Sequence, residues 1–163
     1  MLTANLLAVV LVFGQGLHQV STSDKSEFIG LLRTLPTKGE FYSEEAVRKA
    51  GPYMPTLFSL TEADIRKYDF YQFGAISRGL CDQKDQRDYA VHHFEEIRHP
   101  KLKLLWAVML FNSGVASPEI NEFLKKAVSS KDQSKVLAKM IGPKFQSFKK
   151  RVLLARKSPP NHL

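Results

Sequence analysis

The sequence of 163 residues has a single cysteine, no apolar run long enough to cross a bilayer, and no glycine repeat or low-complexity stretch. One cysteine cannot build a disulfide framework within the chain. A membrane-spanning helix takes about 20 consecutive apolar residues, so the multi-pass membrane class is excluded as well. With 44% hydrophobic and 25% charged residues, the composition is that of one globular domain with a substantial core.

Motifs that carry common enzyme chemistry are also missing. The sequence has no Gly-x-Ser-x-Gly elbow for a serine nucleophile and no glycine-rich loop for a phosphate or dinucleotide. Cys81 lies close to Asp82 and Asp85, whose negative charges raise the pKa of a thiol and oppose its use as a nucleophile. The sequence therefore predicts neither an enzyme nor a bound cofactor.

An apolar run from Leu6 to Phe13 is followed by the small residues Gly14 and Gly16. The run has the length of a signal-peptide core, and the glycines suit a signal peptidase. We expect residues 1–16 to be a signal peptide, and the protein to be secreted and extracellular. The alternative is an amino-terminal core helix, because no lysine or arginine precedes the apolar run.

Apolar residues elsewhere recur mainly at helical spacing, and no alternating pattern predicts a strand. Thr61 and Asp64 form a capping-box pattern for a long helix that is expected to end at Gly79. We expect an all-α fold of about seven short to medium helices in a single domain over residues 17–157, with a polar tail at 158–163. The expected helical ranges are 24–35, 43–50, 62–78, a segment that ends before Pro100, 104–111, 118–128, 131–141 and 144–157.

The segment 104–111 is apolar throughout and by itself fits a buried strand or a buried helix. Pro100 before it and Gly114 after it favour the helix. A faint repeat with an offset of 30 residues sets Phe94 over Leu124. Stacked helical hairpins of the HEAT kind produce such a register, and so do any two hairpins of equal length. The expected architecture is a helical bundle or a short stack of helical hairpins.

Positive charge is concentrated in the last quarter of the sequence. Up to Leu124 there are 13 basic and 15 acidic residues, whereas from Lys125 onward there are 11 basic residues and only Asp132, within a net charge of +8. The lysines of the helix expected over 131–141 recur at i, i+4 and i+8, which places them in a stripe. The residues that we expect to bind an anionic partner are Lys131, Lys135, Lys139, Lys149, Lys150 and Arg151.

Like charges at this spacing repel and cost some stability. This cost favours the interpretation that the lysines form a surface that binds an acidic protein, a sulfated glycan or an anionic membrane surface. Lysine-rich helices also serve solubility alone, and the sequence does not decide between the two interpretations. Nucleic acid is the least favoured partner, because no exposed aromatic platform accompanies the basic residues. If the last helix detaches, its apolar residues are able to enter a membrane surface; if it stays docked, they are expected to be core. These residues are Phe145, Phe148, Val152, Leu153 and Leu154.

Aromatic residues gather over residues 68–73, where they cover more than one helix face. Together with the segment 104–111 they form either a packed core around Trp106 or an apolar pocket. The residues of that alternative pocket are Phe70, Phe73, Trp106 and Phe111. The leading prediction is thus a small secreted helical protein that binds an anionic partner, and the alternative is an extracellular carrier of an apolar, lipid-like small molecule.

The best polar cluster for metal chemistry is His92, Glu96 and His99, in which Glu96 and His99 have the Glu-x-x-His spacing of helical carboxylate metal sites. A second such motif is absent, so we expect surface or helix-terminal histidines and no metal. Cys81 has two interpretations: a buried, inert apolar residue, or the link of a disulfide-bonded dimer.

Overall fold

The structure is a computed structural model, which describes residues 22–35, 37–38, 41–66 and 69–155. The expected signal peptide and the expected tail lie outside these residues. Within them the chain is almost entirely helical, and the only strands are two of two residues each that pair in antiparallel fashion. The elements are α1 (Thr22–Thr34), β1 (Thr37–Lys38), β2 (Phe41–Tyr42), α2 (Glu44–Ala50), η1 (Gly51–Tyr53), α3 (Met54–Ser59), α4 (Glu62–Ile65), α5 (Phe70–Asp82), α6 (Lys84–His92), η2 (Phe94–Glu96), α7 (Pro100–Asn112), α8 (Pro118–Ser129), α9 (Lys131–Ile141), η3 (Gly142–Lys144) and α10 (Phe145–Leu154), where η denotes a 3-10 helix. The all-α prediction is confirmed.

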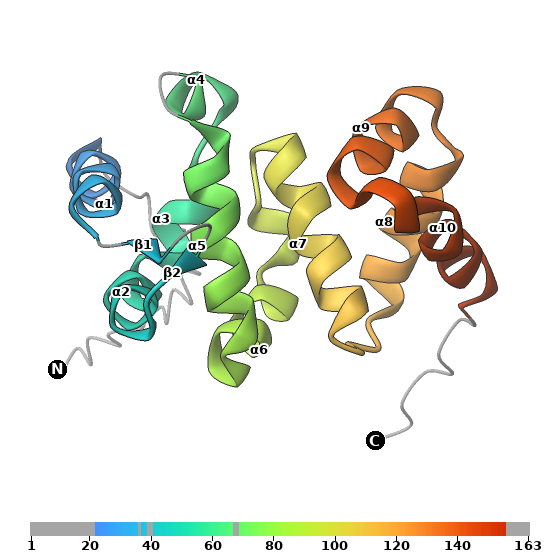
Figure 1. Cartoon of the computed structure of the whole chain (residues 1–163), viewed down its shortest axis with the longest axis horizontal. Coiled ribbons are helices and arrows are strands. Elements are labelled where there is room, and N and C mark those ends of the chain that lie inside the picture. Colours follow the sequence, from blue (N-terminus) through green and yellow to red (C-terminus); the bar gives the residue numbers. More distant parts are fainter. Residues whose placement is uncertain (1–21, 36, 39–40, 67–68, 156–163) are drawn as a thin grey trace, which may run out of the picture.

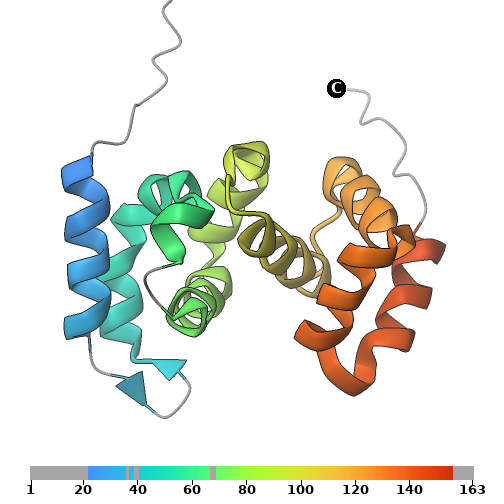
Figure 2. The ribbon, with the colours of Figure 1, turned by 90° about the horizontal axis from the view of Figure 1, so that it is seen from above.

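The helices follow one another along the long axis of the molecule, from α1 and α2 at one end to α8, α9 and α10 at the other (Figure 1). Helix α7 lies between these groups, as the view from above also shows (Figure 2), and it contacts α5 and α6 on one side and α8 and α9 on the other. Trp106 is fully buried in α7, and Phe58 packs against its ring edge-on at 5.4 Å. A helix covered on both sides is apolar all round, which explains the segment 104–111.

The prediction of a single helix over 62–78 was wrong, because two helices, α4 and α5, form instead. The capping box at Thr61 and Asp64 forms as predicted and begins the short helix α4. A second cap then begins α5, because the carboxylate of Asp69 accepts a hydrogen bond from the backbone N–H of Tyr71 at 3.0 Å. An aspartate immediately before an aromatic segment was the sequence signal for this break.

Gly79 lies inside α5 and does not end it, in contrast to the prediction. A side chain at this position would collide with Val47 of α2, so the glycine permits the close approach of the two helices. Helix α5 continues to Asp82. The position of this glycine thus reflects packing rather than helix termination.

The helix expected to run up to Pro100 ends earlier, at His92, and the chain continues through the 3-10 turn η2. Pro100 is the first residue of α7 and therefore starts a helix. Proline is common at this position because the backbone N–H that it lacks would have no partner within the first turn of a helix. The imidazole of His99 caps α7 by accepting a hydrogen bond from the N–H of Leu102 at 3.3 Å. His99 is helix-terminal as expected, but at the start of the following helix.

Helices α8 and α9 form where the sequence places them. The hydroxyl of Ser117 caps α8 ahead of Pro118, and that of Ser130 caps α9. Gly142, with a φ of 69°, ends α9 in a conformation that favours glycine. An offset of 30 residues aligns α7 with α9, but it sets the 3-10 turn η2 against the middle of α8. The repeat therefore holds only for the second helix of each pair.

Candidate functional site

The predicted lysine stripe lies on the outer face of α9. Lys131, Lys135 and Lys139 are all exposed, while Leu137, on the opposite side of the helix, is fully buried. The flanking apolar residues Val136, Met140 and Ile141 are half-buried rather than fully buried as expected. The helix is thus docked along one narrow apolar line and leaves its basic face to solvent.

The three basic residues of α10 differ in their surroundings. Lys150 is exposed and Lys149 is half-buried. The guanidinium of Arg151 donates a hydrogen bond to the side-chain carbonyl of Asn112 at 2.7 Å and lies 5.6 and 5.9 Å from the ring centroids of Phe111 and Phe148. Arg151 therefore helps to dock α10 on α7, in addition to adding positive charge.

Helices α8, α9 and α10 pack on one another as the end group of the molecule (Figures 1 and 2). The ammonium of Lys125 in α8 donates a hydrogen bond to the carbonyl of Ala155 at 2.7 Å, at the end of α10. This contact places a cation at the negative end of the α10 dipole and ties the two helices together. The stripe and the basic residues of α10 consequently belong to one packed unit.

The charge of this unit is largely uncompensated. Between Lys125 and Ala155 there are nine basic residues and a single carboxylate, Asp132. Among the described residues of this stretch, Lys126 alone reaches a carboxylate, that of Glu122 at 3.9 Å. Six lysines make no ion pair with any described residue: Lys131, Lys135, Lys139, Lys144, Lys149 and Lys150.

Several basic residues of the preceding helices, in contrast, form ion pairs. Lys25 lies 2.8 Å from Asp64, and Lys103 lies 2.7 Å from Glu95. Within helices, lysines are paired with a carboxylate four residues away, as Lys84 is with Asp88 at 2.7 Å. The basic face of α9 and α10 is defined as the six lysines that form no ion pair with a described residue, and it differs from the preceding helices because Asp132 is the single carboxylate between residues 125 and 155.

The aromatic residues of the alternative pocket are spread through the packed interior. Phe73 and Trp106 are buried in the core, with exposed fractions of 1% and 0%. The ring of Phe70 stacks on His99 at 5.6 Å, and that of Phe111 meets Phe148 edge-on at 5.5 Å. Each ring therefore has another side chain of this protein as its neighbour.

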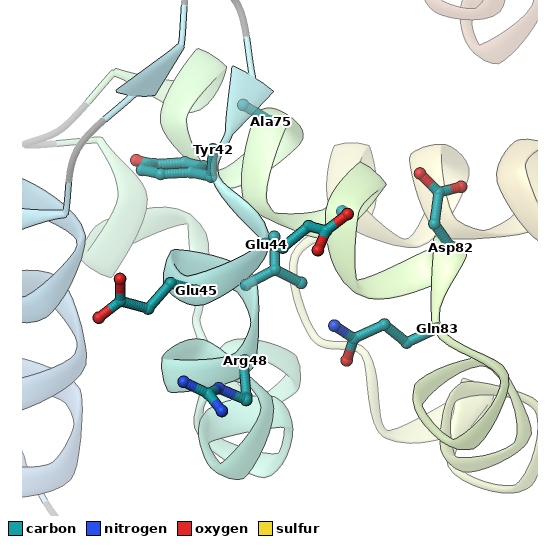
Figure 3. Close-up of a pocket in the computed structure, with 9 residues that line it drawn as sticks. Tyr42, Glu44, Glu45, Arg48, Ala75, Asp82 and Gln83 are labelled. Carbon is teal, nitrogen blue, oxygen red and sulfur yellow. The ribbon is translucent and has the colours of Figure 1, made fainter.

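A surface hollow of about 890 Å³ lies between α2 and the end of α5, and no sequence pattern indicates it (Figure 3). Its lining is mixed: Glu44 and Gln83 extend into the space between the helices, whereas Glu45 and Arg48 point away. A smaller hollow of about 210 Å³ is bordered by Phe70 and His99. Neither hollow is lined by Phe73, Trp106 or Phe111.

The three residues of the weak metal motif do not come together. His92 contacts the carbonyl of Asp88 at 2.7 Å, Glu96 contacts His93 at 2.8 Å, and His99 caps α7. In the part of the chain that the structure describes, no three histidine, cysteine or acidic residues are grouped so as to hold a metal ion.

Cys81 is buried, with 4% of its surface exposed, and its sulfur lies 3.9 Å from the hydroxyl of Ser113. Burial raises the pKa of the thiol above its ordinary value, and the neighbouring hydroxyl opposes this change only in part. The thiol thus has the surroundings of a core residue. The disulfide-linked dimer stays a prediction.

Comparison with family models, with curated proteins and with solved structures gives no match for this chain. None of the helices in the described ranges has the length and apolar composition that crossing a bilayer requires.

Proposed function

We propose that this chain is a small secreted binding protein that engages an anionic partner through the basic face of α9 and α10. The partner is an acidic protein, a sulfated glycan or an anionic membrane surface. Enzymatic catalysis is not part of the proposal, because the sequence has no recognisable catalytic motif.

One observation carries this proposal: six lysines of one packed unit have no carboxylate partner among the described residues. Concentrating positive charge in this way costs stability through repulsion, and the cost is offset when an anionic partner neutralises it. The stripe of Lys131, Lys135 and Lys139 follows one helix face without interruption by a bulky apolar side chain. Such a line of charges suits an extended anionic surface.

The carrier alternative has less support. An apolar ligand needs an unfilled interior, and Phe70, Trp106 and Phe111, which were expected to line the pocket, pack against other side chains of this protein. Nucleic acid remains the least favoured partner, because Phe145 and Phe148 of α10 are buried and offer no stacking platform.

Binding of the secreted protein to an immobilised sulfated polysaccharide tests the proposal. We expect wild-type binding to weaken steeply as salt is added. Exchanging Lys131, Lys135 and Lys139 together for glutamate should lower the affinity about tenfold or more, because it removes three cations and adds three anions on one face.

The matched control exchanges Lys49, Lys84 and Lys101 for glutamate, which changes the net charge by the same amount on helices outside the basic face. This variant should retain most of the affinity. Equal losses in both variants would contradict the proposal, because binding would then follow net charge and the lysines of α9 would serve solubility alone.

A further inference from the structure

The end of α10 presents two adjacent leucines to solvent. Leu153 is 50% exposed and Leu154 is 69% exposed, and the only other large apolar side chain exposed in the described part of the chain is Tyr71 of α5. Sequence reasoning placed both leucines in the core of a docked helix. The helix is docked through Phe145, Phe148 and Val152, which are buried, but the two leucines face outward.

The helical register sets these leucines beside one lysine of the basic face. Lys150 lies three and four residues before Leu153 and Leu154, so the three side chains share one face of α10. That face is opposite the buried face, since Phe148 and Val152 are both in the core. An exposed apolar pair therefore adjoins a cation that forms no ion pair with a described residue, and the helix does not have to detach to present this pair.

We propose that this end of α10 inserts into the headgroup region of an anionic lipid bilayer, with Leu153 and Leu154 in contact with acyl chains and with Lys149 and Lys150 at the lipid headgroups. The inference rests on the proposed function and names its partner. Lys150 and the half-buried Lys149 lie within four residues of the leucine pair along α10, close enough to reach headgroups. Lysine stems also lie readily along apolar surface while the ammonium stays in water.

The apolar pair distinguishes a bilayer from the other anionic partners. A sulfated glycan offers no apolar surface, so binding it would leave both leucines in water. A bilayer offers negative headgroups and acyl chains at adjacent depths, and this combination is what an outward-facing basic and apolar helix surface fits. A pair of leucines is a small anchor, so the binding is expected to be reversible and to require anionic lipid.

Sedimentation with lipid vesicles tests the inference. The wild-type protein should bind vesicles of phosphatidylcholine with phosphatidylserine and should not bind vesicles of phosphatidylcholine alone. Exchanging both leucines for serine should lower the partition into the mixed vesicles about tenfold, because two apolar side chains lose their contact with acyl chains. Tyr71→Ser, at an exposed site on α5, should leave the partition unchanged.

A fluorescence measurement supplies the second readout. Leu154→Trp should show a blue shift with the mixed vesicles, whereas the fully buried Trp106 contributes a constant background. Wild-type partition in the double-serine variant, or a tryptophan at 154 that stays in water, would overturn the insertion.

The polysaccharide assay separates the two proposals. If the double-serine variant still binds the sulfated polysaccharide like wild type but no longer binds the mixed vesicles, both proposals are supported. Binding of the wild-type protein to the polysaccharide without any binding to vesicles would overturn the insertion and leave the proposed function standing. Failure to bind either would overturn both.

Discussion

At the residue scale, Asp64 connects the first helix to the start of α4. Its carboxylate accepts hydrogen bonds from the ammonium of Lys25 and from the N–H and hydroxyl of Thr61, each at 2.8 Å. Partial burial opposes ionisation of Asp64, but these three donors outweigh it and lower the pKa of the carboxyl from 3.8 to about 2. Folding thus favours the ionised form of this residue.

Asp64→Asn should lower the free energy of unfolding by about 1–2 kcal/mol at neutral pH, because the amide keeps the shape but not the charge. The folded-state pKa lies below the unfolded one, so the contribution is complete above about pH 4 and is lost as the pH falls toward 2. Urea unfolding at neutral and acidic pH should show the gap between variant and wild type closing. The exposed Asp88→Asn serves as the control and should change stability little; equal effects of both would contradict the account.

His99 also makes the free energy of unfolding depend on pH, but its side chain is a base, whereas that of Asp64 is an acid. Burial lowers the pKa of its imidazole, Glu62 raises it, and Lys101 lowers it further. Because the folded pKa lies below 6.5, the unfolded chain takes up the proton first, and the free energy of unfolding falls as the pH drops below about 6.5. Protonation also removes the acceptor that caps α7.

His99→Asn keeps a capping acceptor and removes the titration. We expect this variant to lose less stability than wild type between about pH 7 and pH 5 in urea unfolding. His92→Asn, at an exposed position, should follow the wild-type profile. Parallel profiles for wild type and His99→Asn would show that the imidazole has no part in the pH dependence.

At the element scale, the packing of α2 on α5 depends on Gly79. Gly79→Ala should lower the free energy of unfolding by about 1–3 kcal/mol, because the added methyl group meets the side chain of Val47. Gly30→Ala in α1 is the matched control: nothing lies within 4 Å of its new methyl group, so it should raise stability by about 0.5–1 kcal/mol. Thermal unfolding of both variants measures the difference, and a stabilising Gly79→Ala would refute the close approach.

Elements that begin with a local signal could be located from the sequence. Ser117 and Pro118 mark α8, and the capping box marks α4, because both devices act within four residues. The break before α5 was missed because the apolar spacing on both sides of it continues a helical pattern, and the cap at Asp69 was overlooked. Gly79 was misinterpreted because its reason, the side chain of Val47, lies on a distant helix.

Part of the candidate site could likewise be predicted from the local sequence, and part of it depends on contacts between distant residues. The stripe on α9 follows from the spacing of its lysines, since residues four apart on a helix share a face. The role of Arg151 in docking did not follow, because Asn112 lies 39 residues away. The exposure of Leu153 and Leu154 also follows from helical spacing, because their face of α10 is opposite the one that carries the buried Phe148 and Val152.

At the scale of the whole molecule, charge is segregated along the long axis. Up to Leu124 the sequence has 13 basic and 15 acidic residues, whereas the basic face of α9 and α10 has six lysines that form no ion pair with a described residue. The two ends are joined through the apolar helix α7. Binding at the basic end is therefore expected to leave the packing around α2 and α5 unchanged.

Amide chemical shifts recorded during titration with a sulfated polysaccharide are the best test of anion binding at the basic face, because they report on the whole backbone at once. We expect the changes to cluster over residues 131–150, in α9 and α10, and to be reversed by added salt. Changes centred on the hollow between α2 and α5, or spread evenly over all exposed lysines, would contradict this expectation.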